Sequence, residues 1–220
     1  MNCFDIIGPI MIGPSSSHTA GAARIGKIAG TLLGEPAVSA EITLSGSFAE
    51  TYRGHGTDKA LVAGIMGMSP DDTRLRDSLN LAKKEGLEVK FICRNLDDTH
   101  PNTAVIDLVA KSGKTISIQG ASVGGGNILI TKINGLSVEI NGQYTVLVVV
   151  HKDKPGTIAA VTHYMAGLGL NICNFRLARK QKGGTAVMTI EIDGAINESV
   201  SSEVASLANV MSCTLLPVNG

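Results

Sequence analysis

The pattern of hydrophobic and polar positions is most regular in the last third of the chain. A β-branched apolar run at 144–150 is typical of a buried strand. Asp153-Lys154-Pro155-Gly156 then forms a turn, with Pro155 placed to begin a helix that Gly167 and Gly169 end. The pattern continues with a strand at 171–178, a strand at 186–192, a helix at 196–207 and a strand at 214–218. This βαββαβ order predicts a ferredoxin-like domain.

The earlier part of the chain alternates less regularly and is richer in Gly and Ser. Its periodicity predicts helices at 19–33, 57–67 and 73–86. It predicts strands at 39–48, 88–94, 102–110, 115–122, 128–133 and 137–140, with hairpin turns at 111–114 and 132–135. We therefore expect an α+β domain in which helices come first and an antiparallel sheet follows.

The change of pattern coincides with Asn141-Gly142, a dipeptide that commonly forms a turn. A chain of 220 residues is long enough for one large domain or two small ones. We therefore predict two domains, 1–142 and 143–220, and an α+β fold class for the whole chain.

Charge and aromatic content exclude some classes of partner. The 19 basic and 19 acidic residues give a formal net charge of zero, so the sequence shows no electrostatic footprint for nucleic acid or an anionic membrane. Aromatic residues make up 3 % of the chain, which argues against a surface that stacks single-stranded bases. The apolar run at 146–150 is far shorter than a membrane span. The sequence predicts no signal peptide and a soluble, cytoplasmic protein.

The four cysteines lie far apart in the sequence, and none forms a CxxC pair. Structural zinc and cluster motifs normally bring their ligands in close pairs. We interpret Cys3, Cys93, Cys173 and Cys213 as reduced thiols packed as small hydrophobic residues, and expect no metal ligand in this chain.

The first polar motif precedes the helix predicted at 19–33. It reads Gly13-Pro14-Ser15-Ser16-Ser17-His18-Thr19. A helix N-terminus presents free N–H groups and a partial positive charge, which favour a carboxylate or phosphate. One serine would be enough to cap the helix, so three in a row followed by His favour ligand binding, with simple capping as the alternative.

The second motif, Gly54-His55-Gly56-Thr57-Asp58, places a His between two glycines. The glycines remove side-chain bulk around the imidazole and leave it accessible. Asp58 lies where it can cap the next helix or hydrogen-bond the imidazole and select its tautomer. A surface His in a glycine turn is the equally weighted alternative.

Two further motifs accompany the predicted strands. In His100-Pro101-Asn102-Thr103, Pro101 keeps His100 extended, and Asn102 offers donors and an acceptor to a polar ligand. A polar turn is the alternative. Ser122-Val123-Gly124-Gly125-Gly126-Asn127 can be a bulge, or can bring backbone N–H groups against an anion.

In this order and in one domain, the four motifs resemble the β domain of iron–sulfur L-serine dehydratases, lyases that convert L-serine to pyruvate and ammonia. The resemblance implies an α subunit as partner, whose cysteines ligate a [4Fe–4S] cluster, and it implies no pyridoxal cofactor. It leaves open whether threonine is also a substrate.

The resemblance also implies roles for the motif residues. His55 is expected to be the base that removes the Cα proton, with His18 as a second catalytic residue. The substrate-binding residues are expected to be Ser15, Ser16, Ser17, Thr19, Asp58, His100 and Asn102, with Gly124 and Gly125 shaping the floor of the pocket.

The last third of the chain resembles an ACT domain, a small-molecule regulatory module. The resemblance rests on the element order, on Asp153-x-Pro155-Gly156 before the first helix, and on Gly169-Leu170-Asn171-Ile172 after it. It implies that L-serine binds as an effector at Asp153, Pro155, Gly156 and Asn171, and that the chain forms a homodimer through this domain.

A second interpretation makes the chain purely regulatory. The layout of the first domain is similar to the allosteric substrate-binding domain of some phosphoglycerate dehydrogenases. Paired with an ACT module, such a domain could be a sensor of serine or an anion without catalytic activity.

Overall fold

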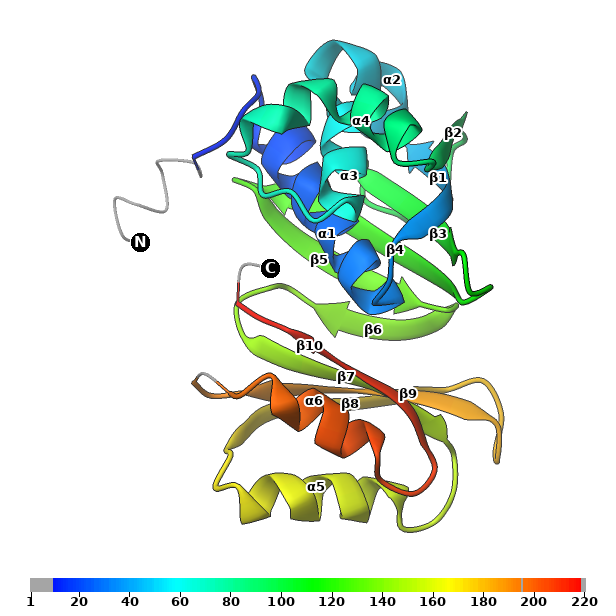
Figure 1. Cartoon of the computed structure of the whole chain (residues 1–220), viewed down its shortest axis with the longest axis vertical. Helices are drawn as coiled ribbons and strands as arrows, with labels where there is room; N and C mark the ends of the chain where they lie inside the picture. Colours follow the sequence, from blue (N-terminus) through cyan, green and yellow to red (C-terminus); the bar gives the residue numbers. More distant parts are fainter. Residues whose placement is uncertain (1–9, 195, 219–220) are drawn as a thin grey trace. The chain divides into compact units, whose positions relative to one another are not determined.

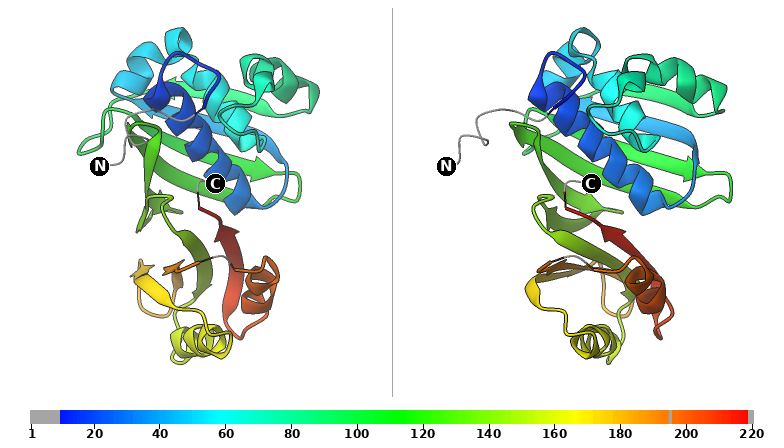
Figure 2. Two further views of the ribbon diagram at one scale, coloured as in Figure 1. Left: turned by 90° about the vertical axis from the view of Figure 1, so that its left-hand side faces the viewer. Right: turned by 60° about the vertical axis from the view of Figure 1, so that its left-hand side comes forward.

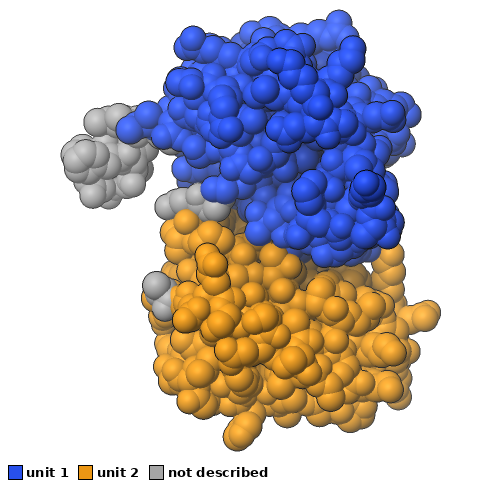
Figure 3. Space-filling model, in the orientation of Figure 1, with its two compact units in different colours: residues 1–135 blue, residues 136–220 orange. Residues whose placement is uncertain are grey.

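The computed structural model describes residues 10–194 and 196–218. The chain divides into two compact units, Met1–Gly135 and Leu136–Gly220 (Figure 3). Within the described residues, no helix is long and apolar enough to cross a membrane.

The first unit contains a helical layer packed on a sheet (Figures 1 and 2). The helical segments are the π-helical turn η2 (Ser16–Gly21), α1 (Ala22–Leu33), α2 (Ser47–His55), α3 (Thr57–Ile65), the 3-10 turn η3 (Thr73–Asp77) and α4 (Ser78–Lys84). The strands are β1 (Ala37–Ser45), β2 (Glu88–Cys93), β3 (Thr103–Ala110), β4 (Thr115–Gly124) and β5 (Asn127–Ile133), followed by β6 (Leu136–Ile140).

The strand order is β2-β1-β3-β4-β5-β6. β2 runs parallel to β1, whereas the β1–β3, β3–β4 and β4–β5 pairs are antiparallel. Alternate residues of β1 and β3, among them Ile42, Leu44, Ile106 and Leu108, are buried, which is the pattern of strands with one face on a core.

Helices α1 and α3 approach each other at backbone distance. A Cβ at Gly26 would overlap the carbonyl of Leu61, and one at Gly64 would overlap the carbonyl of Ala23. The small residues of α1 therefore make a close helix contact, and both helices can lie on the sheet.

Helix α2 corrects the sequence prediction of a strand through residue 48. β1 ends at Ser45, and Gly46 turns the chain with φ 55° against the backbone of Pro101. Phe48 is then fully buried on a helix instead of at a strand end. The local pattern of residues 39–48 is consistent with a strand, but the burial of Phe48 places residues 47 and 48 in a helix.

The second unit confirms the ferredoxin-like prediction. Its elements are β7 (Thr145–Lys152), α5 (Thr157–Gly167), β8 (Ile172–Arg179), β9 (Thr185–Ile192), α6 (Ser199–Ala205) and β10 (Val210–Leu216). The strand order is β10-β7-β9-β8. Leu147, Val149, Met188 and Ile190 of the sheet pack in one core with Val161, Met165, Val200 and Val204 of the two helices.

The compact second unit begins ahead of the domain boundary that the sequence suggests after residue 142, because it includes β6. β6 lies near β8 and β9. Arg176 of β8 and Glu139 of β6 form an ion pair at 2.6 Å. The Asn134-Gly135 turn before β6 has φ values of 50° and 73°, as a two-residue hairpin requires.

The cysteines differ in part from the sequence interpretation. Cys213 packs against the core of the second unit, and burial raises the pKa of its thiol to about 12. Cys93 and Cys173 are exposed, so the prediction that they pack as hydrophobic residues is wrong. Cys93 is the last residue of β2 and Cys173 lies on β8, and both strands are at the edge of their sheets. Cys3 lies outside the described residues.

The contact between α1 and α3 generates a stability prediction. Gly64→Ala is expected to lower the free energy of unfolding by about 2–3 kcal/mol, because the added methyl group meets backbone that cannot move aside cheaply. Chemical denaturation followed by circular dichroism measures the change.

The matched control is Gly167→Ala at the end of α5, where a Cβ meets nothing within 4 Å. It is expected to be neutral or to stabilise by up to about 1 kcal/mol. Equal destabilisation by the two substitutions would contradict the close helix contact.

Candidate functional site

The first motif forms a π-helical turn that carries His18. Ser15 is its N-cap, and the Ser15 hydroxyl oxygen accepts a hydrogen bond of 3.2 Å from the His18 backbone N–H. The same oxygen lies 3.3 Å from His18 Nδ1. Ser15 therefore caps the turn, as the alternative interpretation proposed, and also contacts the imidazole. Short π-helical turns are rare and frequently occur at functional sites.

The His18 ring packs against α2. Its Nε2 is 3.2 Å from the hydroxyl oxygen of Ser47. The ring centroid is 5.2 Å from that of Phe48 and 4.7 Å from that of His55, both in edge-to-face arrangements. Two imidazoles from different motifs thus form a pair, and hydroxyls on both nitrogens of His18 restrict its orientation.

The surroundings of His18 favour its neutral form. Burial lowers the pKa of His18 below its usual value, and the nearby charge of His55 lowers it further, whereas the hydrogen bond with Ser47 acts in the opposite direction. A neutral imidazole can accept a proton or a hydrogen bond at neutral pH.

His55 is the last residue of α2, and Gly56 caps that helix with φ 71°. The structure thus places it at a helix end rather than in a free turn. Its Nδ1 atom is buried and has no hydrogen-bond partner among the described residues. A Cβ at Gly54 or at Gly56 would meet nothing within 4 Å, so there is open space at both glycines that flank His55.

Asp58 does not contact the imidazole of His55 through any hydrogen bond of the described residues. Its carboxylate accepts a bond of 2.8 Å from the backbone N–H of Lys59. Burial raises the pKa of Asp58, although the N–H of Lys59 and the charge of its side chain act in the opposite direction. Asp58 therefore lies near the site but supports the first turn of α3.

The loop before β3 lies against the start of α2. The carbonyl of Pro101 accepts a hydrogen bond of 3.3 Å from the N–H of Phe48. The Asn102 N–H donates to Nδ1 of His100, and the His100 side chain is exposed. The Asn102 amide donates to the carbonyl of Ser122 at 3.4 Å, while its Oδ1 is buried without a partner in the described structure.

The glycine-rich loop joins β4 to β5 and is tied to α1. Gly124, Gly125 and Gly126 all have positive φ values, of 106°, 61° and 82°, which side chains would disfavour. Arg24 of α1 donates a hydrogen bond of 2.7 Å to the carbonyl of Gly126. Ser122 lies so close to Gly21 of the π-helical turn that a Cβ there would overlap its hydroxyl.

The four motifs therefore lie next to one another around the π-helical turn, with His18 and His55 in direct contact and His100 facing its own loop. The sequence did not single out Ser47, Phe48 or Arg24. The one sequence signal for Ser47 was its position after Gly46, because a glycine followed by a serine can end a strand and begin a helix. Arg24 looks like an ordinary surface position of a helix until its partner 102 residues away is known.

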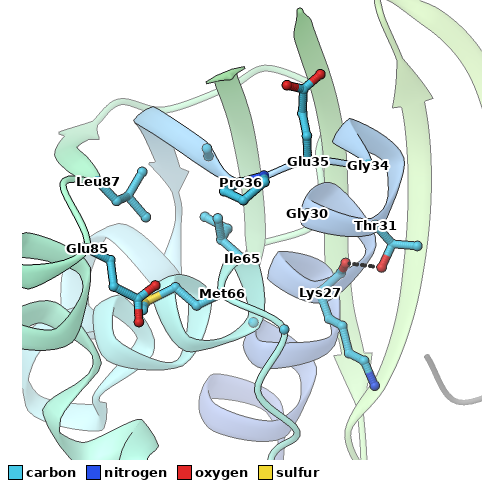
Figure 4. Close-up of a pocket in the computed structure, with 13 residues that line it drawn as sticks. Lys27, Gly30, Thr31, Gly34, Glu35, Pro36, Ile65, Met66, Glu85 and Leu87 are labelled. Atoms are coloured by element: carbon cyan, nitrogen blue, oxygen red, sulfur yellow. Dashed lines mark hydrogen bonds between the residues drawn. The ribbon is translucent and has the colours of Figure 1, made fainter. Parts of the chain in front are cut away.

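Two cavities lie at opposite ends of the α1–α3 pair. One, of about 540 Å³, is lined in part by Thr19, His55 and Lys59. The other, of about 500 Å³, is lined by the C-terminal ends of both helices and contains no motif residue. Figure 4 shows the second cavity: Ile65, Pro36 and Leu87 lie around it, and the Thr31 hydroxyl bonds the carbonyl of Lys27.

The residues expected to bind an effector lie in two places in the second unit. Asp153 accepts hydrogen bonds from Arg179 at 2.5 Å and from the N–H of Gly183 at 2.9 Å, and these contacts lower its pKa. The Asn171 amide donates to Asp193 at 2.6 Å. Pro155 and Gly156 are exposed before α5. The polar ends of Asp153 and Asn171 thus bind other residues of the chain.

Within residues 10–194 and 196–218, no group of three or more His, Cys, Asp or Glu side chains is placed to hold a metal ion. Cys93, Cys173 and Cys213 lie on β2, β8 and β10, and the surroundings of the last two raise the pKa of the thiol. A raised pKa disfavours the thiolate that binds iron.

Two family models match parts of the chain. The family model described as serine dehydratase beta chain matches residues 2–86, and the one described as an AHAS small subunit-like ACT domain matches residues 147–212.

Similar proteins extend the match over nearly the whole chain. A probable L-serine dehydratase beta chain of Bacillus subtilis is 42 % identical over 96 % of both chains. The L-serine dehydratase beta chain of Peptoniphilus asaccharolyticus is 39 % identical over 92 % of both. A D-3-phosphoglycerate dehydrogenase of Bacillus subtilis is 22 % identical over 89 % of this chain and 37 % of its own length. The chain belongs to the family of L-serine dehydratase beta chains, with an ACT domain at residues 147–212.

Proposed function

We propose that this chain is the β subunit of an iron–sulfur L-serine dehydratase, active with an α subunit in converting L-serine to pyruvate and ammonia. The observation that carries the proposal is the contact of His18 with His55 where all four polar motifs meet. The names of the two relatives that are matched over 96 % and 92 % of their length support a partner α chain.

Loss of water from serine requires removal of the Cα proton and departure of the C3 hydroxyl. We assign the first task to His55, because its Nδ1 has no partner among the described residues and open space adjoins its flanking glycines. His18, neutral and oriented by Ser15 and Ser47, keeps the His55 ring in place and can accept a hydrogen bond from the substrate.

The remaining motif residues form the surroundings of the substrate in this proposal. Ser16, Ser17, Thr19 and Asn102 offer hydroxyl and amide groups, and Gly124 and Gly125 allow a close backbone approach. Asp58 supports the helix that follows His55. His100 lies on the same loop as Asn102. After water has left, the aminoacrylate product tautomerises and is hydrolysed to pyruvate and ammonia without further catalysis.

The cofactor belongs to the α subunit in this proposal. A [4Fe–4S] cluster with an open iron site supplies a Lewis acid for the C3 hydroxyl. The described cysteines of the present chain lie on separate strands, and two have raised pKa values. They do not fit as cluster ligands, so this chain provides imidazole and hydroxyl groups. Free thiols also agree with a reducing, cytoplasmic location.

A purely regulatory role is the second candidate, and the D-3-phosphoglycerate dehydrogenase match over 89 % of the chain favours it. An assay of dehydratase activity with the α subunit, in the presence and absence of this chain, separates the two functions. A regulatory chain would change the activity of a partner that is already active, whereas a dehydratase β subunit is required for any turnover.

We also propose that L-serine binds the ACT domain at the loop of Asp153, Pro155 and Gly156 with Asn171, and that the chain dimerises through this domain. The exposed Pro155-Gly156 backbone at the start of α5 supports a ligand there. The carboxylate of Asp153 holds the loop through Arg179 and Gly183 rather than facing the ligand.

The role of His55 can be tested in the enzyme assembled with its α subunit under anaerobic conditions. His55→Ala is expected to lower kcat by roughly 10²–10⁴-fold, because the base is lost. The visible absorption of the cluster should be unchanged. His163→Ala, at an exposed position of α5, is the control and should keep full activity. Near-normal kcat in His55→Ala would exclude His55 as the base.

The pKa of His18 makes a second prediction. Nuclear magnetic resonance of the His18 ring is expected to show a titration midpoint below 6.5, which moves upward in His55→Gln because a neighbouring charge is removed. The folded pKa lies below the unfolded value, so the unfolded chain binds more protons between the two. His18 therefore reduces stability as the pH falls through 6.5, and His18→Gln should weaken this loss. A midpoint above 6.5 would contradict the assignment.

The effector site can be tested by calorimetric titration of the full chain with L-serine. We expect a saturable heat component that Asn171→Ala removes and His55→Ala retains, since the two substitutions lie in different units. D-serine is the matched control ligand. A titration without heat, or heat that disappears only in His55→Ala, would count against an effector at the ACT domain.

A further inference from the structure

The cavity beside His55 has walls from several elements of the first unit. It has a volume of about 540 Å³ and lies between the segment at 11–14, the π-helical turn and the starts of α3 and η3. Thr19, His55, Lys59 and Arg76 provide its polar lining. The inference below rests on the proposed function and concerns the same site.

The charge of this lining is positive. Lys59 comes from α3 and Arg76 from η3, and no Asp or Glu of the described residues lines the cavity. Among the described residues neither cation forms an ion pair, whereas the neighbouring Arg74 pairs with Asp72 at 2.6 Å. Asp58, next to Lys59 on α3, is close enough for the Lys59 charge to act on its pKa, but its carboxylate does not line the cavity. Two cations from separate elements thus line one cavity whose described lining has no carboxylate, which favours an anionic ligand.

Two buried polar atoms of the lining are also without partners. Thr19 is 1 % exposed, and its hydroxyl has no hydrogen bond within the described part of the chain. Gly13 packs directly against it, so that the threonine side chain has little freedom to turn away. His55 Nδ1 is unpartnered in the same way. Buried polar groups are normally satisfied, and those that are not call for an explanation such as a ligand.

We propose that Lys59 and Arg76 bind the carboxylate of the L-serine substrate in this cavity, with a hydrogen bond from the Thr19 hydroxyl. The carboxylate is attached to Cα, so its position in the cavity brings the Cα proton toward His55. Pairing with two cations offsets the negative charge that develops at Cα when the proton leaves. The cavity thereby selects α-amino acids over amines that lack a carboxylate.

Kinetics of the assembled enzyme test the proposal. Lys59→Gln and Arg76→Gln are each expected to raise KM for L-serine by about 10- to 100-fold, the loss typical of one charge-assisted contact, with a smaller change in kcat. Arg76→Lys should recover part of the loss. Lys27→Gln is the control, because Lys27 lines the cavity at the other end of α1. Unchanged KM in both cavity variants, with an active wild type, would refute the carboxylate site and leave the proposed function intact.

A binding measurement on the full chain without its partner is independent of activity. Acetate is the probe, and the backbone amide signals of Thr19 and Gly56 report on binding. Saturable shifts are expected in the wild type and in Lys27→Gln, and none in the Lys59→Gln/Arg76→Gln double variant. L-serinamide, which has no carboxylate, should leave these signals unchanged. No shift with acetate in the wild type, or equal shifts in the double variant, would overturn the proposal even if the assembled enzyme proved inactive.

Discussion

The backbone contact between α1 and α3 determines where the site forms. Gly26 and Gly64 let the two helices touch without intervening side chains. The π-helical turn before α1 and the start of α3 border one cavity, and the C-terminal ends of α1 and α3 border the other. His18 precedes α1 by four residues and His55 precedes α3 by two. The approach of the helices therefore brings the two imidazoles to 4.7 Å.

This geometry also explains the electrostatic character of the site. Partial burial and the proximity of a second imidazole both disfavour a charge on His18. Lys59 and Arg76 line the cavity beside His55. The first unit thus combines an imidazole with a lowered pKa, that of His18, with two cations around the adjoining cavity.

Both units contain polar residues of the predicted sites, some with partners within the chain and some without. In the first unit, several buried polar atoms of the motifs have no partner among the described residues. In the second, Asp153 and Asn171 are satisfied by Arg179, Gly183 and Asp193. Unsatisfied polar groups are costly to maintain and concentrate where a ligand or partner completes them. His151 Nε2 and Thr157 Oγ1 of the second unit are also buried without a partner among the described residues, so both units keep polar atoms that a ligand or partner would complete.

The sequence by itself determined the βαββαβ order of the second unit and the identity of the four motifs. Its strands and helices follow from local periodicity, and Gly, Pro and Asn marked the turns. Only the tertiary structure decided that residues 47–55 form a helix, because Phe48 is buried by packing and Gly46 turns against Pro101. Only it revealed the partners of His18 and Arg24, which lie 29 and 102 residues away in the chain. Such contacts depend on how helices pack on the sheet, and no local pattern of residues records that packing.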